Sequence, residues 1–293
     1  SGYYDVLERT LYNGLISGVS LSGDRFFYPN PLESYGQHER SPWFGCACCP
    51  ANITRFIPSI PGYIYAKKAD RLYINLFIES TADIELNGEM LEIEQKTRYP
   101  WEGIVEIELK PEKATTFELF IRIPGWALNR PVPGDLYRFY EDNYLKATLF
   151  VNNQKQEITL QEGYVVLKQK WNRGDIIRLE LPMPVRKIIA HEKVKADSGR
   201  VALQRGPVVY CLEWPDNINR QVSKIKLDPE TKLSADYRPD LLDGIYVING
   251  ITPGHNRISP NDPEIVFHEF TAIPYYAWAN RGPGEMTIWM VSF

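Results

Sequence analysis

The chain has 293 residues, of which 33 are basic and 37 acidic, so its formal net charge is −4. This balance argues against a protein that binds nucleic acid mainly through phosphate contacts. Hydrophobic residues make up 44%, which is enough for a sizeable core, and no apolar run reaches the roughly 18 residues of a membrane-spanning helix.

Residues 1–65 predict two helices separated by extended chain and a polar loop. Apolar residues between Tyr4 and Ile16 recur at helical spacing, and a second helix is expected to begin near Pro50, because proline is accepted in a first turn. Two helices cannot bury their apolar stripes alone. Since the chain begins at Ser1 without methionine or a secretory leader, we expect the end of a helical domain that starts upstream.

Beyond Tyr63 the pattern changes to short β-rich runs bounded by Gly, Pro, Asn or Asp. The runs cover residues 72–78, 104–109, 116–123, 148–151, 164–168, 176–181, 201–203, 208–212, 245–248, 265–273 and 286–291. Such runs predict a sandwich or barrel. Residues 126–143 and 216–243 are predicted as loops, the latter with room for a short helix. We therefore expect a mainly β chain with domains 1–65, 66–186 and 187–293.

Cysteine is concentrated in residues 43–50 (WFGCACCP), which hold Cys46, Cys48 and Cys49. Thiolates are soft ligands for zinc, iron–sulfur clusters or copper(I), and a cysteine at a helix start is also a candidate nucleophile. The cluster lacks the paired spacing of a zinc finger. Three buried cysteines acting as small hydrophobes therefore remain an alternative.

Other candidate residues have simpler interpretations beside functional ones. His38 lies in a polar loop and is a candidate substrate contact or a solvated side chain. Glu33 and Glu39 are a candidate acid/base pair or loop charges. Cys211 is expected in the core. Trp278 is a candidate sugar platform or a core residue, because aromatic faces suit sugar rings and β-rich cores also collect aromatics.

Several patches together resemble glycoside hydrolase family 127, the β-L-arabinofuranosidases. In family order they are residues 5–14 (DVLERTLYNG), 25–33 (RFFYPNPLE), 46–50 (CACCP), 122–126 (RIPGW), 204–207 (QRGP) and 277–282 (AWANRG). The resemblance extends over essentially the whole chain. The related family 146 acts on similar linkages, and these motifs do not separate the two families.

The resemblance implies the last helices of an (α/α)6 barrel followed by two jelly-roll-like β-sandwiches. It also implies a zinc ion held by a glutamate and three cysteines, one of which attacks the sugar in a retaining reaction. Matching the motif residue by residue, Cys48 corresponds to the nucleophile and a zinc ligand, and Cys49 to another ligand. Cys46 corresponds to a substrate-pocket residue, as does Tyr12 or Tyr28, with Tyr12 favoured.

One departure limits this transfer. No Glu-x-Cys motif occurs in the chain, although the family draws zinc ligands from one, and its acid/base glutamate and pocket histidines also lie upstream of the matching segment. We therefore expect the chain alone to be inactive and to bind zinc weakly, if at all.

Two hypotheses follow. The first is the C-terminal part of a zinc-dependent retaining glycosidase that releases β-L-arabinofuranose or a similar sugar from arabinose-containing glycans. The second is a non-catalytic carbohydrate-binding or assembly module with structural cysteines. We expect no nucleic-acid or membrane partner. The resemblance allows a homodimer, and it leaves cytoplasmic and periplasmic locations open.

Overall fold

The computed structural model describes residues 1–142, 145–217, 221–228, 230–259 and 262–292. Strands predominate over helices, which confirms the expectation of a mainly β chain. The residues form two compact units, each drawn from separate stretches of sequence. Unit 1 comprises residues 1–8, 56–133 and 143–183, and unit 2 comprises residues 9–55, 134–142 and 184–293. In the described part of the chain, no helix is both long and apolar enough to span a membrane.

Both predicted helices are present, but each is shorter and less uniform than its apolar spacing suggests. Helix α1 (Gly2–Arg9) continues as a π-helical turn (Thr10–Leu15) and a 3-10 turn (Ile16–Gly18). Helix α2 (Cys48–Phe56) continues as 3-10 turns (Ile57–Tyr63). Other short 3-10 turns are Gly125–Leu128, Lys195–Asp197, Trp214–Asp216, Val222–Lys224 and Tyr275–Ala277.

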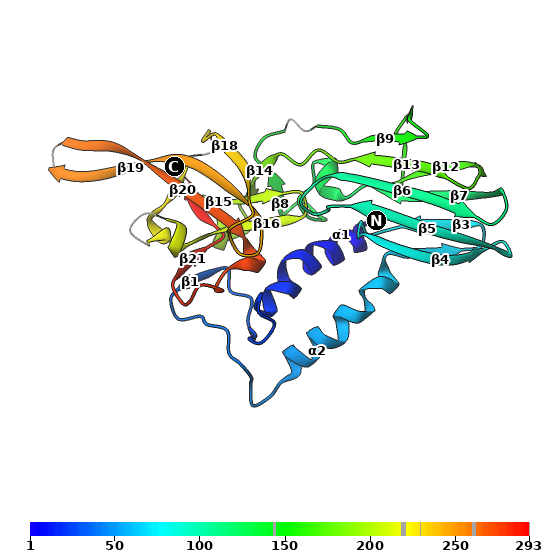
Figure 1. The fold of residues 1–293 in the computed structure, drawn as a ribbon. Coiled ribbons are helices and arrows are strands. Elements are labelled where there is room, and N and C mark those ends of the chain that lie inside the picture. Colours follow the sequence, from blue (N-terminus) through cyan, green and yellow to red (C-terminus); the bar gives the residue numbers. More distant parts are fainter. Residues whose placement is uncertain (143–144, 218–220, 229, 260–261, 293) are drawn as a thin grey trace. The chain divides into compact units, whose positions relative to one another are not determined.

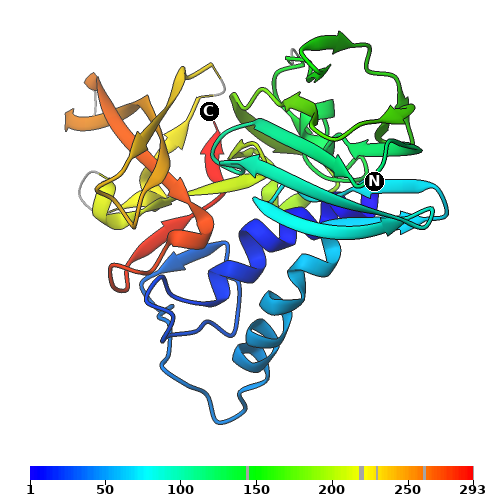
Figure 2. The same cartoon turned by 45° about the vertical axis from the view of Figure 1, so that its right-hand side comes forward.

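Unit 1 contains two curled sheets, drawn in cyan and green in Figure 2. The first has the order β10 (Gln154–Gln156), β9 (Thr148–Val151), β13 (Asp175–Glu180), β6 (Ile104–Pro111), β5 (Glu89–Thr97), β4 (Ser80–Leu86). The second has the order β11 (Leu160–Gln161), β12 (Tyr164–Trp171), β7 (Thr115–Arg122), β3 (Arg71–Ile74), β2 (Tyr65–Lys68). All pairs are antiparallel except β3 with β7.

Alternation of buried and exposed residues explains why these strands form sheets with one covered face. In β6, Val105, Ile107 and Leu109 are fully buried, while the residues between them are more exposed. The β4–β5 hairpin was not among the predicted strands. Its turn is Asn87-Gly88, with φ of 56° and 77°, which suits the type I′ turn that connects twisted antiparallel strands.

A buried charge cluster ties α1 to the second sheet within unit 1. Arg122, fully buried at the end of β7, donates to Asp5 at 2.8 Å and to Glu8 at 2.5 Å. Its Nε donates to the carbonyl of Asn75 at 2.6 Å, and Tyr99 donates its hydroxyl to Glu8 at 2.7 Å. Burial alone lowers the pKa of Arg122, but the carboxylates of Glu8 and Asp5 outweigh it and raise the pKa, so the guanidinium stays charged.

Unit 2 is built on one eleven-stranded sheet. Its main path is β17 (Lys226–Leu227), β22 (Met290–Ser292), β15 (Arg200–Arg205), β16 (Val208–Glu213), β20 (Asp262–Pro274), β19 (Ile245–Ser259), β18 (Leu233–Arg238). Four strands branch from it: β14 (Val185–Ala190) beside β15, β8 (Tyr137–Phe139) beside β14, β21 (Glu285–Thr287) beside β16, and β1 (Glu33–Tyr35) beside β21. Figure 1 shows β19 and β20 as a long two-stranded ribbon.

Two predicted loops contain strands of unit 2. Residues 126–143 contain β8, and residues 216–243 contain β17 and β18 as well as a 3-10 turn. Both predictions of unpaired loop were wrong at these strands, because pairing with β14, β22 and β19 compensates for weak local preference. The predicted strand 286–291 is two strands, β21 and β22, with different partners.

The core of unit 2 packs against this sheet and anchors the segment after α1. Buried apolar members include Val201, Leu203, Val208, Tyr210, Leu212, Val222, Ile225, Leu227, Ile248, Phe270, Ala272 and Met290. Asn13 is also buried, and its amide nitrogen donates to the carbonyl of Pro207 at 3.0 Å while its oxygen accepts from the N–H of Val209 at 2.7 Å. These bonds fix the π-helical turn to the sheet.

Candidate functional site

The cysteine cluster lies where an irregular loop becomes helix α2, within unit 2. Figures 1 and 2 show this blue segment as an open loop that ends at the start of α2. Cys48 is the first residue of α2, Cys49 follows it, and Cys46 lies in the preceding bend. Cys46 and Cys48 are exposed and Cys49 is half-buried, so the alternative of three buried, inert cysteines does not match the structure.

Tyr28 is the neighbour that defines the chemistry of Cys48. Its hydroxyl lies 2.9 Å from Sγ of Cys48, within hydrogen-bond distance. Phe44 packs edge-on against the Tyr28 ring, with 4.9 Å between ring centroids. The sulfurs of Cys48 and Cys49 are 3.8 Å apart. The Cys46 thiol is close enough to raise the pKa of Tyr28 and to lower that of Cys48. The structure thus brings together four predicted site residues: Tyr28, Cys46, Cys48 and Cys49.

These contacts give the cysteines different acidities. The Tyr28 hydroxyl lowers the pKa of Cys48, since a hydrogen bond donated to sulfur favours the thiolate, and the neighbouring thiols add to this effect. Partial burial and the adjacent Cys48 sulfur raise the pKa of Cys49. Burial raises the pKa of Cys211 well above that of an ordinary thiol. Cys48 is therefore the most acidic of these three thiols.

We expect iodoacetamide to alkylate Cys48 first, then Cys49, and Cys211 only after unfolding, because the thiolate is the reacting form. As pH falls from 9 to 7, the thiolate of Cys48 should persist to lower pH than that of Cys49. Peptide mass spectrometry of samples quenched over time measures each rate. A faster reaction at Cys49 than at Cys48 would contradict the assigned acidities.

The remaining candidates lie elsewhere in unit 2. Tyr12 lies half-buried in the π-helical turn after α1. His38 lies half-buried in the loop after β1 and makes no hydrogen bond or ion pair with any described residue. Their roles in substrate binding stay predictions. Cys211 is fully buried in β16, as expected. Trp278 is 1% exposed and stacks on Phe27, so its ring offers no face to a sugar.

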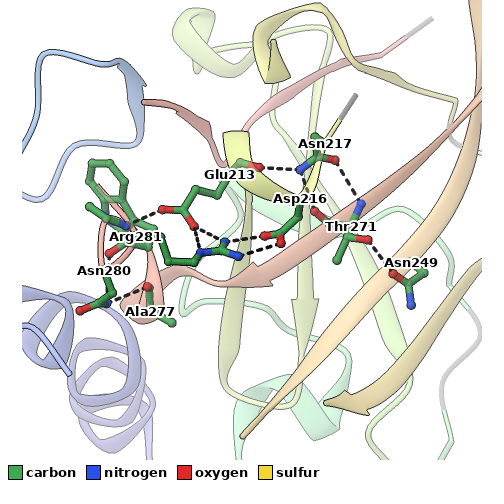
Figure 3. A network of polar contacts seen from close by, with 10 residues as sticks. Glu213, Asp216, Asn217, Asn249, Thr271, Ala277, Asn280 and Arg281 are labelled. Atoms are coloured by element: carbon green, nitrogen blue, oxygen red, sulfur yellow. Dashed lines mark hydrogen bonds and ion pairs between the residues drawn. The ribbon is translucent and has the colours of Figure 1, made fainter. Parts of the chain in front are cut away.

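A polar network explains why residues 277–282 form a motif without joining the cysteine cluster. Figure 3 shows Arg281 between the carboxylates of Glu213 and Asp216. Arg281 donates Nε to Glu213 at 3.1 Å and Nη1 to Asp216 at 2.7 Å, and the N–H of Ala279 donates to Glu213 at 2.7 Å. Burial raises the pKa of the Glu213 carboxyl, which Arg281 counteracts. This arrangement fixes the turn after β20 and leaves neither carboxylate free for acid/base work.

The described residues contain no group of three or more His, Cys, Asp or Glu side chains arranged to hold a metal ion. The cluster offers two adjacent sulfurs, at Cys48 and Cys49. Sequence reasoning identified both, but it favoured Tyr12 over Tyr28, whose bond to Cys48 spans 20 residues of irregular chain.

Comparison with known proteins assigns the chain to a family. Residues 1–62 match the catalytic-domain model of the GH127 β-L-arabinofuranosidases, residues 71–183 match the GH127 middle domain, and residues 185–291 match the family 127 C-terminal domain. The chain belongs to glycoside hydrolase family 127.

Individual GH127 relatives agree with this assignment. A non-reducing end β-L-arabinofuranosidase of Bifidobacterium longum subsp. longum is 34% identical over 98% of the chain and 45% of its own length. A solved GH127 β-arabinofuranosidase is 44% identical, with a TM-score of 0.95, over 100% of the chain and 46% of its own. A GH127 β-L-arabinofuranosidase from Geobacillus stearothermophilus T6 is 40% identical, with a TM-score of 0.88, over 99% and 46%. The chain thus spans less than half the length of these relatives.

Proposed function

We propose that this chain supplies the nucleophile of a retaining glycoside hydrolase that releases β-L-arabinofuranose, or a similar sugar, from arabinose-containing glycans. The observation that carries the proposal is the exposed Cys48 thiol at the start of α2, acidified by the Tyr28 hydroxyl. The relatives named as β-L-arabinofuranosidases support the choice of sugar.

The proposed chemistry is a double displacement at the anomeric carbon. The Cys48 thiolate attacks that carbon, the glycosidic C–O bond breaks, and the leaving oxygen takes a proton from a general acid. Water then gives a proton to the conjugate base of that acid and forms a new C–O bond, the C–S bond breaks, and the thiolate is regenerated. Two inversions give net retention. Tyr28 holds the sulfur in its charged form and fixes its direction.

The donor set of the cluster fits part of a zinc site. Two thiolates bound to one tetrahedral zinc at about 2.3 Å each lie about 3.8 Å apart, and the sulfurs of Cys48 and Cys49 are 3.8 Å apart. A bound zinc ion would further acidify Cys48 and hold its sulfur in place. Since four ligands complete such a site, we propose that the others come from residues outside these 293, as the family resemblance implies.

The finer architecture belongs to the same proposal. We infer that residues 1–65 end an (α/α)6 barrel and that the two β regions are jelly-roll-like sandwiches, and the family resemblance allows a homodimer. The general acid and the remaining zinc ligands would come from the preceding part of the barrel. On this proposal the 293-residue chain alone does not turn over substrate.

Zinc content tests the split site. After dialysis against a dilute chelator, elemental mass spectrometry should find close to one zinc ion per molecule in a longer protein with a complete GH127 catalytic domain. The 293-residue chain should hold little, because two thiolates leave a zinc site half-formed. Release of arabinose from a β-L-arabinofuranosyl substrate is assayed in parallel. A longer protein with neither zinc nor arabinose release would refute the proposal.

The alternative, a non-catalytic carbohydrate-binding module, loses its best candidate platform. Trp278 is buried against Phe27, and Tyr275 is 3% exposed. Aromatic sugar platforms need an exposed ring face. The exposed, acidified Cys48 instead favours the catalytic proposal.

A further inference from the structure

Arg40 lies at a junction of three segments of unit 2. The side chain is in the loop after β1, and the residue is only 2% exposed. Its Nη1 donates to the carbonyl of Trp278 at 2.6 Å, and its Nη2 donates to the carbonyls of Ser17 at 2.9 Å and Tyr276 at 3.3 Å. The guanidinium thus joins the end of the first helical region to the turn after β20.

The same guanidinium clamps the residue that precedes Tyr28. It lies over the ring of Phe27, with 4.5 Å from Cζ to the ring centroid. The Phe27 ring also stacks on Trp278, at 5.0 Å and an interplanar angle of 16°. The N–H of Phe27 donates to the carbonyl of Gly18 at 3.0 Å. Phe27 therefore has both its ring and its backbone held by neighbours of Arg40.

Burying the Arg40 guanidinium at this junction of three segments carries a desolvation cost. Burial lowers the pKa of Arg40 to about 10, which leaves it charged at neutral pH. Among the described residues Arg40 forms no ion pair within 4.0 Å, although the more distant Glu213 carboxylate favours its charged form, and its Nε has no hydrogen-bond partner. An apolar side chain would fill the space without burying a charge. The planar fork, which reaches three carbonyls and stacks on a ring, is what an apolar residue or lysine does not supply.

We propose that Arg40 is a positioning residue for Cys48 and acts through Tyr28. By holding Phe27 it fixes the backbone from which the Tyr28 ring extends, and so keeps the hydroxyl at 2.9 Å from Sγ. A shift of about 1 Å would weaken that hydrogen bond. The inference deepens the proposed function, on which its catalytic meaning rests. The mechanical link itself, from Arg40 to Cys48, needs neither substrate nor zinc.

A double-mutant cycle on the zinc-free chain tests the link. The variants are Arg40→Gln, Tyr28→Phe and the two combined, and the measured quantity is the rate constant for iodoacetamide alkylation of Cys48 at pH 7.5. Tyr28→Phe should slow alkylation about three- to tenfold, the value of one hydrogen bond. Arg40→Gln should slow it by a similar factor, and the double variant should be no slower than Tyr28→Phe alone.

Two further variants separate positioning from loss of stability. Leu227→Ala removes a fully buried residue from the core of unit 2 and should lower the melting temperature without changing Cys48 alkylation. Arg40→Lys keeps the charge but loses the fork, so it should slow alkylation in the same direction. If Arg40→Gln does not fold, Arg40→Lys takes its place in the double-mutant cycle.

Three results would overturn the inference: an unchanged rate in folded Arg40 variants, an unchanged rate in Tyr28→Phe, or falls that multiply in the double variant. Arabinose release by a longer protein with a complete catalytic domain is scored separately. Coupled alkylation rates without arabinose release would retain the positioning role and refute the proposed function. Arabinose release together with uncoupled effects of the two substitutions on Cys48 alkylation would retain the proposed function and refute the positioning role.

Discussion

Cys48→Ser is expected to lower the rate of arabinose release by at least about a thousandfold in a protein that carries this chain with a complete catalytic domain. Serine has nearly the size of cysteine, but its hydroxyl is far less acidic, so the Tyr28 hydrogen bond cannot make it a comparable nucleophile. Initial rates on a β-L-arabinofuranosyl substrate measure the loss, and the unfolding temperature should stay within a few degrees of the parent value.

Cys211→Ala is the matched control for this variant. Cys211 is a fully buried thiol in β16, far along the sequence from the cluster. Its removal should lower stability and leave turnover per folded molecule unchanged. If Cys48→Ser kept a tenth or more of the parent rate, another group would have to be the nucleophile.

Arg122→Met is expected to reduce the free energy of unfolding of unit 1 by about 3–5 kcal/mol, the usual cost of removing one partner from a buried ion cluster. The substitution leaves the Glu8 and Asp5 carboxylates without their cation, and Glu8 is only 2% exposed. It also removes the bond to the Asn75 carbonyl. Urea denaturation followed by tryptophan fluorescence measures the change.

Lys113→Met provides the surface comparison within the same unit. Its ammonium pairs with Glu89 at 3.1 Å, but the Lys113 side chain is 76% exposed. Exposed pairs contribute about 0–1 kcal/mol, so this variant should unfold close to the parent. Equal losses in the two variants would mean that burial does not set the value of the Arg122 cluster.

Sequence periodicity found the strands that bury one face, and it failed where pairing overrides composition. Residues 104–109 alternate between apolar and polar side chains, and residues 116–123 contain a dense apolar run. Both segments lie almost entirely in strands, β6 and β7. Strand β18 is polar, and only pairing with β19 makes it extended. The β4–β5 hairpin carries a turn signal in its sequence, Asn87-Gly88 between two segments of alternating polarity, although it was not among the predicted strands.

The sequence was sufficient to predict the thiols of the candidate site, but not the residues that contact or position them. Cys48 and Cys49 stand out as adjacent cysteines before a helix, whatever the fold. Tyr28 and Arg40 belong to irregular chain with no period to place them. Arg40 acts on carbonyls 23 and 238 residues away, so only the folded chain reveals what it holds.

The cluster around Arg122 bears on whether the β regions of this protein are portable modules. Residues 66–186 look self-contained in sequence, yet Arg122 takes both of its carboxylate partners from the first eight residues. A protein made of residues 66–186 alone would contain the buried Arg122 guanidinium without its carboxylate partners. Transfer of this β region to another protein would therefore require helix α1 to be transferred as well.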